Sequence, residues 1–423
     1  MDLLLVPVPL FTEENAVETY LFQYRKGNDL LAAAKDSIHL DGAMRSPILE
    51  MIELVGLDAL TMGKPIFVPV NKYMLMANIE SACSESPENI IFLIDGEVKG
   101  DATNVRNIKR LRELGYRFGL RRIDNIAAYL PILEQCDFIF YDQRKFSEAG
   151  QVSLREAVSA RYPDIKCVYT NIDSMEVFQG ARRKLKGMYE GSFYRMPFTD
   201  GNNKVSPLQV NMINLLNRVR SDNFDFDAVA KIIQRDPALT ISLLRMVNTG
   251  SRGRRNEIKS INGAVVMLGQ DEVRKWITAA AAGKLGSEKP NEITKLSLIR
   301  ARFAEALAVK FGLYADAQSL FLMGVFSVLD AMLEMPMEDA LKLVLVSGDI
   351  REALVSHTGK YGDVYNFMID YESADWGAVS RSLIIHDLST EDVYDAYVES
   401  LCWYRDMLVG DDEDIEAEGD EAR

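Results

Sequence analysis

Two adjacent arginines, Arg121 and Arg122, follow the apolar run FGL, a pattern that predicts the C-terminal end of a short buried strand. A third arginine, Arg25, is the last residue of another predicted strand, which ends in LFQYR. Guanidinium groups bind phosphate oxygens through paired hydrogen bonds, so these side chains could meet and bind an anion or a nucleotide. Pairing with carboxylates such as Asp124 or Asp142 explains them equally well, and charge complementarity alone leaves both interpretations open.

The other reactive residue types form no pattern that predicts a catalytic or metal site. The 4 cysteines lie far apart and fall in no CxxC or Cys/His spacing, so we expect reduced, buried thiols. His39 and His357 have no partner at ligand or triad spacing. An apparent helix start at Ser389 follows the dipeptide His386-Asp387, so we predict a capping and loop role for this dipeptide.

Composition and charge exclude several classes of function. The chain has 423 residues, 48% of them hydrophobic and 26% charged, which is typical of a globular protein with two or three domains. Its formal net charge of −15 opposes a general attraction to nucleic acid or anionic lipid. We therefore expect neither direct DNA binding nor membrane association.

The apolar segments predict a cytoplasmic protein. In MDLLLVPVPLF, Asp2 replaces the basic residues of a signal peptide and two prolines interrupt the apolar run, so we predict a first strand. The run LFLMGVFSVLDAML (320–333) is too short to span a bilayer and contains Asp330.

Up to about residue 200, β-rich runs alternate with helical patterns such as TNVRNIKRLREL, which predicts an α/β unit with a mostly parallel sheet. Their number suits a closed barrel and an open sheet equally. The 7 predicted strands are LLLVP, ETYLFQYR, PIFVPV, NIIFLID, YRFGL, DFIFYD and IKCVYT.

The composition changes at YRMPFTDGNNKVSPLQ (194–209), where Pro, Gly, Asn and Asp together predict a linker. Beyond it the pattern is helical, and Asp236 can cap a helix that begins at Pro237. The end of the chain, DDEDIEAEGDEAR, predicts a disordered acidic tail. We predict an α/β domain over residues 1–200, a helical domain over 201–409 and the tail over 410–423.

The order of these segments resembles a bacterial two-domain architecture, an EAL-type domain followed by an HDOD domain. VPLF (8–11) leading into LFQYR (21–25), and the closing stretch YEGSFYRMP (189–197), are similar to the two ends of an EAL domain. RDPALTISLLRMVNTGS (235–251) and SINGAVVMLGQDEVRKW (260–276) resemble HDOD domains more strongly. The resemblance implies a (β/α)8-like barrel, whose active members hydrolyse cyclic di-GMP with divalent metals at the C-terminal ends of the strands.

At the positions that carry this chemistry in the family, most residues here cannot supply it. Arg121 and Arg122 stand where the family has paired metal-binding aspartates, and two cations oppose a divalent metal. Arg25, Asp142 and Asp173 keep family-like chemistry. The remaining positions, which the resemblance expects to hold glutamate, asparagine, lysine or glutamine, are Leu21, Pro69, Leu93, Phe140, Thr170 and Glu190.

HDOD domains resemble metal-dependent HD phosphohydrolases, and here their first histidine position is similar to Leu296 and their His-Asp pair to Ser327-Val328. We therefore predict a degenerate EAL-like barrel followed by an all-helical HDOD domain, with no catalytic residue, metal or cofactor. The first hypothesis is a regulatory scaffold or adaptor in a cyclic di-GMP-linked pathway that works through protein partners, with a homodimer left open. The alternative is a non-hydrolysing sensor that binds cyclic di-GMP or another phosphate ligand at the barrel mouth, through Arg25, Arg121 and Arg122. The third hypothesis is different enzyme chemistry at the barrel mouth.

Overall fold

The computed structural model describes residues 3–26, 46–96, 98–121, 129–144, 156–197, 207–220, 263, 267–285 and 291–408. The chain folds into two compact units. The barrel unit combines residues 1–196 with 370–394, and the helical unit combines 197–369 with 395–423. Residues 370–394 therefore belong to the same unit as the barrel, whereas the predicted range 201–409 assigns them to the helical domain.

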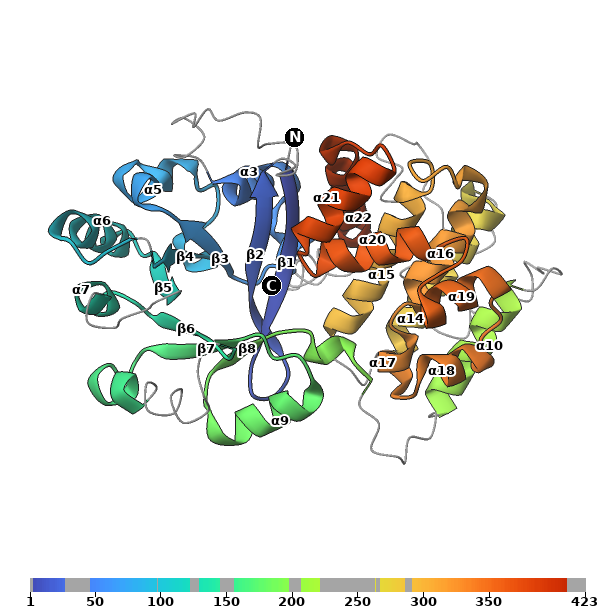
Figure 1. Cartoon of the computed structure of the whole chain (residues 1–423), viewed down its shortest axis with the longest axis horizontal. Coiled ribbons are helices and arrows are strands. Elements are labelled where there is room, and N and C mark those ends of the chain that lie inside the picture. Colours follow the sequence, from blue (N-terminus) through green and yellow to red (C-terminus); the bar gives the residue numbers. More distant parts are fainter. Residues whose placement is uncertain are drawn as a thin grey trace, which may run out of the picture. The chain divides into compact units, whose positions relative to one another are not determined.

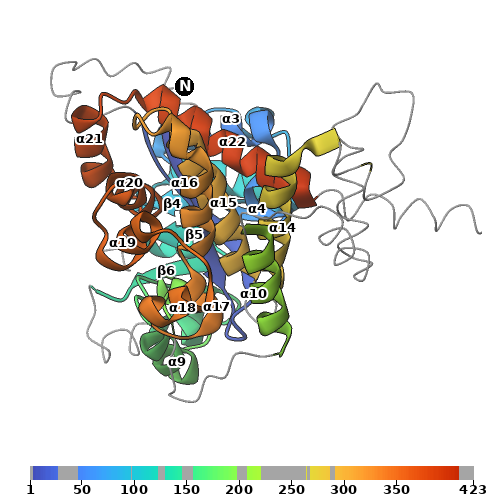
Figure 2. The ribbon, with the colours of Figure 1, turned by 90° about the vertical axis from the view of Figure 1, so that its right-hand side faces the viewer.

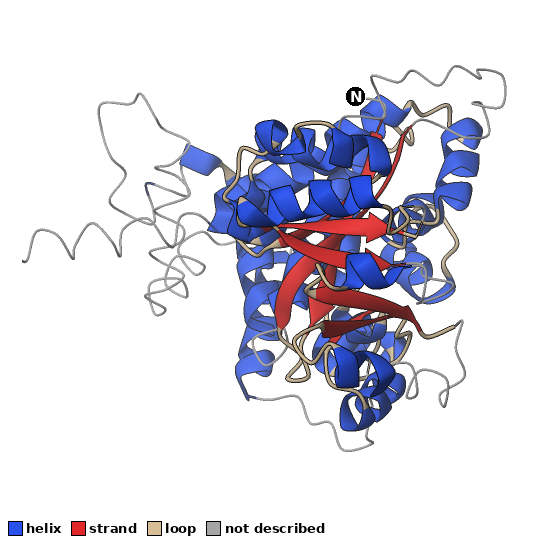
Figure 3. Ribbon diagram, turned by 90° about the vertical axis from the view of Figure 1, so that its left-hand side faces the viewer, coloured by secondary structure: helices blue, strands red, loops and turns tan. Residues whose placement is uncertain are grey.

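Eight strands of the described residues close a barrel in sequence order (Figures 1 and 3). β1 is antiparallel to both β2 and β8, and the other neighbouring strands are parallel. The closed sheet confirms the predicted barrel, and all seven predicted strands are present, with β8 as a short addition at the start of the closing stretch. The bounds are β1 (Leu3–Phe11), β2 (Val17–Lys26), β3 (Ile66–Val70), β4 (Ile90–Asp95), β5 (Arg117–Arg121), β6 (Phe138–Asp142), β7 (Lys166–Thr170) and β8 (Met188–Glu190).

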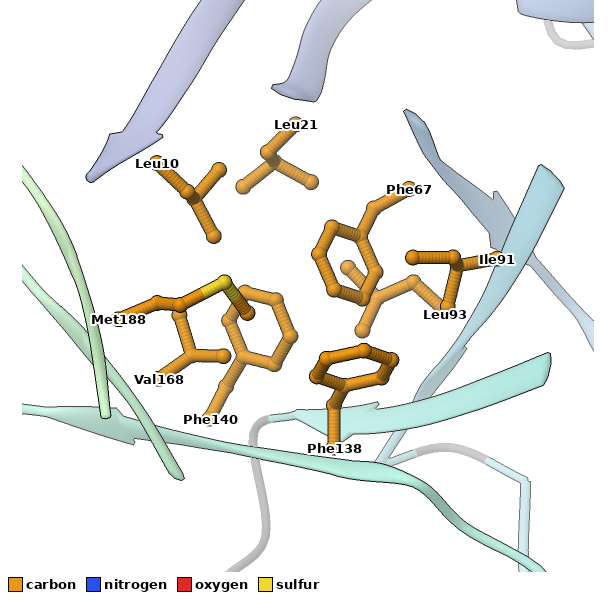
Figure 4. Packing of buried hydrophobic residues seen from close by; sticks show 9 residues of the cluster. All are labelled: Leu10, Leu21, Phe67, Ile91, Leu93, Phe138, Phe140, Val168 and Met188. Atoms are coloured by element: carbon orange, nitrogen blue, oxygen red, sulfur yellow. The ribbon is translucent and has the colours of Figure 1, made fainter. Parts of the chain in front are cut away.

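Apolar side chains from every strand except β5 meet inside the barrel (Figure 4). On β5, Gly119 leaves room for the side chains of Leu93, Phe67 and Phe140, because a Cβ there would lie 3.1 Å from Leu93 Cδ1, 3.2 Å from Phe67 Cε1 and 3.4 Å from Phe140 Cε2. The barrel interior is therefore packed rather than open. We call this set the interior cluster: Leu10, Leu21, Phe67, Ile91, Leu93, Phe138, Phe140, Val168 and Met188.

Short helices cover the outer face of the barrel. The α6 start is set by Asp101, whose Oδ1 accepts from the amides of Thr103 at 3.0 Å and Asn104 at 2.9 Å, and this helix confirms the one predicted at TNVRNIKRLREL. The helices are α3 (Pro47–Val55), α4 (Leu57–Thr61), α5 (Lys72–Met76), η1 (Ile79–Ala82), η2 (Pro87–Asn89), α6 (Ala102–Glu113), α7 (Leu130–Leu133), α9 (Met175–Lys184) and η4 (Phe193–Arg195).

The helical unit is built around α15 and α16, which lie side by side (Figure 2). Gly324 allows this approach, because a Cβ there would lie 2.4 Å from the Cα of Ala301. The described helices of the chain beyond the barrel strands are α10 (Pro207–Arg220), α14 (Gln270–Leu285), α15 (Asn291–Leu307), η5 (Tyr314–Asp316), α16 (Ala317–Phe326), α17 (Leu329–Leu333), α18 (Met337–Leu343), α19 (Gly348–Ser356), α20 (Gly362–Glu372), α21 (Trp376–Ile385) and α22 (Thr390–Leu408).

The end of α21 confirms the capping and loop role predicted for His386-Asp387. His386 is the C-cap residue of α21, and Asp387 has a φ of +51° in the turn that follows. Ser389 Oγ accepts from the amide of Asp392 at 3.0 Å, which starts α22 as predicted. The predicted cap at Asp236 and the acidic tail lie outside the described residues.

Within the described ranges, no helix combines the length and apolar character needed to cross a membrane.

Candidate functional site

The C-terminal ends of the parallel strands carry a set of polar side chains that we call the barrel mouth. Side chains alternate between the two faces of a strand, so each last residue shares the inward face of the residue two positions before it. Asp95 follows Leu93 of the interior cluster in this way, and Asp142 follows Phe140. The barrel mouth consists of Asp95, Arg121, Asp142, Thr170 and Glu190.

Arg121 forms an ion pair with the neighbouring strand. Its Nε donates to Asp95 Oδ2 at 3.2 Å, and the two side chains are 19% and 21% exposed. The register of β4 and β5 places Asp95 directly opposite Arg121. The second oxygen of Asp95 accepts from the Gly96 amide at 2.8 Å, so both carboxylate oxygens have donors. This carboxylate is thereby used in an internal ion pair.

The partner of Arg121 differs from the carboxylates named from the sequence. Asp124 and Arg122 lie outside the described residues, and Asp142 has other contacts, so Asp95 was the missed partner. Arg25 lies on the inward register of β2, partly buried, opposite Leu4 of β1. Convergence of all three predicted arginines on one anion therefore stays a prediction.

A second network joins the ends of β6, β7 and β8. Asn171 Nδ2 donates to Asp142 Oδ1 at 2.7 Å, and the same oxygen accepts from the Arg144 amide at 3.0 Å. The Arg144 guanidinium donates to the Asn171 side-chain oxygen. Asn171 has a φ of +64°, and its backbone amide donates to Glu190 Oε2 at 3.1 Å.

Glu190 is the group of this network whose proton affinity changes most clearly. Burial raises its pKa above the usual range, and the Asp173 carboxylate adds to the rise. The Asn171 amide and the guanidinium groups of Arg195 and Arg144 act in the opposite direction. A carboxyl group with a raised pKa can hold a proton or exchange one with a ligand, so Glu190 is the titratable candidate of the barrel mouth.

Three positions at which the resemblance expects polar side chains lie below this polar rim. Leu21, Leu93 and Phe140 belong to the interior cluster and are 5%, 0% and 6% exposed. Pro69 lies on β3 between Val68 and Val70. Thr170 donates its hydroxyl to the Tyr141 carbonyl at 3.4 Å. Among the described residues, no three His, Cys, Asp or Glu side chains are grouped closely enough to hold a metal ion.

In the helical unit, one of the positions compared with an HD centre contacts a buried guanidinium. Arg300 Nη1 donates to the Ser327 hydroxyl at 3.1 Å and to its carbonyl at 3.3 Å, and Arg300 is 5% exposed. Leu296 is buried on the same helix, α15. Burial raises the pKa of the nearby Asp330 carboxyl, and the charge of Arg300 partly offsets the rise.

The cysteines and the remaining histidine contacts support structural roles. All four cysteines are free, with Cys136 and Cys167 buried as predicted and Cys83 and Cys402 only half-buried. His357 ends α19 in the left-handed region, and its ring lies 4.9 Å from that of Tyr365. His39 lies outside the described residues.

Comparison with known proteins finds a family match within the helical part. The model of the HDOD domain family matches residues 206–344. An uncharacterized protein of Bacillus subtilis, YuxH, is 23% identical over 411 residues, covering 95% of this chain and 97% of YuxH. The cyclic di-GMP phosphodiesterase CdgJ of Vibrio cholerae is 31% identical over 56% of this chain, and the match spans only 55% of CdgJ.

Solved structures similar to the chain include two EAL domains. One is an EAL domain protein from Listeria monocytogenes, 14% identical, with a TM-score of 0.34 over 46% of this chain and 87% of that chain. The other is the EAL domain of DcpA from Mycobacterium smegmatis, 12% identical, with a TM-score of 0.35 over 45% of this chain and 90% of that chain. The closed barrel and the HDOD match confirm the predicted order of a (β/α)8-like barrel followed by an HDOD domain.

Proposed function

We propose that this chain, an EAL-like barrel followed by an HDOD domain, is a catalytically inactive regulatory protein that acts through protein contacts in a cyclic di-GMP-linked pathway. The observation that carries the proposal is the interior cluster, because Leu21, Leu93 and Phe140 fill the positions where the resemblance expects the polar groups of a phosphodiesterase. The relation to CdgJ supports the pathway, since that relative is named as a cyclic di-GMP phosphodiesterase.

Hydrolysis of a phosphodiester with metal ions needs several oxygen ligands and a bound water. Leu93 and Phe140 offer only carbon atoms, and their contacts around Gly119 leave no room for a hydrated ion in this layer. Removing a divalent ion from water to such surroundings is strongly unfavourable without replacement ligands.

The ion pair at the barrel mouth acts in the same direction. Arg121, at one position of the expected metal-binding pair, neutralises the Asp95 carboxylate of the neighbouring strand. A divalent ion therefore loses this carboxylate as a ligand and would lie beside a guanidinium cation. The helical unit has a similar arrangement, in which Arg300 is the cation beside Ser327.

The test of inactivity is a phosphodiesterase assay on the full chain with cyclic di-GMP and Mg²⁺ or Mn²⁺. We expect no linear dinucleotide above the buffer blank, while CdgJ, assayed in parallel, produces it. Turnover by this chain that disappears in an Asp142→Asn variant would contradict the proposal, because Asp142 is the family-like carboxylate at the mouth.

The adaptor role depends on a surface for partners, and the connection between α15 and α16 offers exposed apolar side chains. Val309 is 67% exposed and Tyr314 76% exposed. Large exposed apolar groups are typical of contact sites between proteins.

Affinity capture tests this surface. We expect a specific partner to be retained by the full chain and lost by the Val309→Asp/Tyr314→Asp variant. Light scattering of the same proteins also reports a homodimer. The control is Leu54→Asp, a similarly exposed apolar position in the barrel unit at 65%. Equal capture by all three proteins would contradict this surface assignment.

The alternative function, a non-hydrolysing sensor, is favoured by the guanidinium groups at the barrel mouth. Arg121 stays 19% exposed despite its ion pair, and it is close enough to Tyr24 to oppose the rise in pKa that burial causes in that phenol. Guanidinium groups can exchange a carboxylate for a phosphate. Calorimetry of the full chain with cyclic di-GMP tests this function: binding that is lost in Arg121→Ala/Arg122→Ala supports the sensor, and no heat at high ligand concentration rules it out.

A further inference from the structure

Residues 370–394, the end of α20 with α21 and the start of α22, pack into the same unit as the barrel although they follow the HDOD match in sequence. We call this segment the latch. Figure 1 shows α21 and the ends of α20 and α22 in red and orange. The contacts below all lie within the barrel unit, so they describe one compact body.

The first contact of the latch completes the edge of strand β1. Among the described strands, β8 is short and pairs only with Leu10 and Phe11, so it leaves the N-terminal part of β1 without a partner strand on that side. The Tyr371 hydroxyl accepts from the Leu5 amide at 3.2 Å and donates to the Leu5 carbonyl at 3.0 Å. Leu5 is fully buried and Tyr371 is 1% exposed, so one hydroxyl replaces the two hydrogen bonds of a neighbouring strand.

The second contact is a buried ion pair between Arg195 and Glu372, whose side chains are 15% and 10% exposed. Burial alone would lower the pKa of Arg195, but the Glu372 carboxylate, together with Tyr194 and Glu190, outweighs that effect and raises it. Arg195 also acts on Glu190 at the end of β8. One guanidinium is therefore paired with a carboxylate of the latch and acts electrostatically on a carboxylate of the barrel mouth.

Further contacts hold both ends of the latch. The Tyr394 hydroxyl donates to Met51 Sδ at 3.6 Å, which ties the start of α22 to α3. The rings of Tyr371 and Trp376 meet edge to face with centroids 5.7 Å apart, so the first two helical pieces are packed together. Release of the latch would expose the Leu5 backbone and leave Arg195 with Glu190 as its carboxylate.

We propose that residues 370–394 are a releasable latch on the barrel, and that Arg195 couples latch release to the charge of Glu190. The physical basis is competition, because an ionised Glu190 stabilises Arg195 when Glu372 withdraws. A neutral Glu190 offers no such compensation, so neutralising it tightens the latch. A proton that neutralises Glu190, or a ligand group that pairs with it, thus controls how tightly the latch binds to the rest of the barrel unit. The latch continues along the chain into residues 395–423 of the helical unit. This coupling is independent of whether the barrel hydrolyses any nucleotide.

The test is hydrogen exchange followed by mass spectrometry on the full chain. Tyr371→Phe removes only the hydroxyl, and Glu372→Gln removes only the charge. We expect each to speed exchange in peptides covering β1 and residues 370–394 by about tenfold, as the loss of a buried hydrogen-bonding partner implies. The matched controls are Tyr73→Phe and Glu14→Gln, which make the same changes at exposed positions of the barrel unit. Wild-type exchange in both latch variants would overturn the latch.

A separate measurement tests the coupling between Glu190 and the latch. An ion pair with only a structural role would leave its result unchanged. Glu190→Gln should slow exchange in residues 370–394 by about fivefold, the lower end of typical couplings between sites. In the reciprocal experiment, Glu372→Gln frees Arg195 for Glu190, so the pKa of Glu190 should fall when followed by carbon-detected NMR. Asp173 and Arg144 are the other charged groups that act on Glu190, so both must be unchanged in the two proteins whose titrations are compared. An unchanged Glu190 titration together with unchanged exchange in Glu190→Gln would overturn the coupling.

Discussion

The barrel and the helical unit fill their interiors in different ways. The interior cluster of the barrel is entirely apolar, and the charged groups of its strands stand at the strand ends. The helical unit buries charges within its core, with Glu292 at 5%, Lys295 at 1% and Arg300 at 5% exposure. In the proposed function both positions lack metal chemistry, because the barrel has only carbon atoms there and the helical unit has the Arg300 guanidinium beside the Ser327 hydroxyl. The stability of the barrel should therefore depend mainly on side-chain volume. The stability of the helical unit should depend on how closely its helix backbones approach each other and on its buried charges.

The largest expected effect is that of Gly324→Ala in the helical unit. The new Cβ would lie 2.4 Å from Ala301 Cα and 2.5 Å from the Arg300 carbonyl oxygen, which are backbone atoms that only a shift of α15 against α16 can move. We expect a loss of at least about 3 kcal/mol in the free energy of unfolding, at the upper end of overpacking costs. Urea unfolding followed by circular dichroism measures it.

Gly180→Ala is the matched control for that variant, because no atom lies within 4 Å of its added Cβ on α9. Alanine is favoured over glycine inside a helix by about 0.8–1 kcal/mol, so this variant should be more stable than the wild type. Similar losses in both variants would mean that the close approach of α15 and α16 is not a constraint in solution.

The next effect tests the buried charges of the helical unit. Lys295 Nζ lies 3.7 Å from Glu292 Oε1, and burial lowers the pKa of Lys295 while Glu292 partly restores it. Glu292→Gln keeps the shape but removes the carboxylate charge beside the ammonium group. We expect a loss of about 3 kcal/mol, the lower end for a broken buried pair, because Lys295 can respond by losing its proton. The double variant Glu292→Gln/Lys295→Met should recover most of that loss. A double variant as unstable as the single one would show that side-chain packing, not charge, determines this site.

Gly119→Ala tests the interior cluster of the barrel and should have a smaller effect. Its Cβ would meet only side-chain atoms, Leu93 Cδ1 at 3.1 Å, Phe67 Cε1 at 3.2 Å and Phe140 Cε2 at 3.4 Å, which can move by a few tenths of an ångström. We expect a loss of about 1–3 kcal/mol in the free energy of unfolding. Adding Leu93→Val to this variant makes room and should restore part of the stability, whereas no restoration would indicate that the interior is less tightly filled than the distances imply.

The sequence was sufficient to predict most of the fold because the strands are continuous apolar runs that end in polar residues. β8 was missed as a strand since only three residues lie between Gly187 and Gly191, where added Cβ atoms would lie 2.2 Å and 2.0 Å from the carbonyl oxygens of Cys167 and Ile172. A run that short carries no periodic signal. Its pairing depends on this close backbone approach instead.

The barrel mouth was predictable in position but not in contacts. The sequence predicted Arg121 at the C-terminal end of a strand, where the structure has it. Its Asp95 partner follows from the register of β4 and β5, and the two residues are 26 positions apart in the sequence. Asn171 and Arg195 gave no signal, because each acts through a turn or a residue distant in the chain. The grouping of residues 370–394 with the barrel was missed for the same reason, since a helical pattern does not indicate which core it covers.

The smallest expected effect is a pH dependence of the free energy of unfolding that comes from Glu190 in the barrel mouth. Burial and Asp173 raise the pKa of Glu190 in the folded state above its ordinary value of 4.5, while Asn171, Arg195 and Arg144 limit the rise. The folded protein then binds more protons than the unfolded chain between the two pKa values, so this group's contribution to stability is full below the unfolded pKa and is lost as pH rises through the folded pKa. Glu190→Gln cannot lose a proton, so the wild type should lose stability relative to this variant as pH rises above about 4.5. Urea midpoints of the two proteins, measured in parallel at each pH, isolate the effect because all other titrating groups are shared. A difference that stays flat, or that changes in favour of the wild type, would mean that the guanidinium groups outweigh burial, in which case Glu190 stays ionised and is a fixed anion of the barrel mouth.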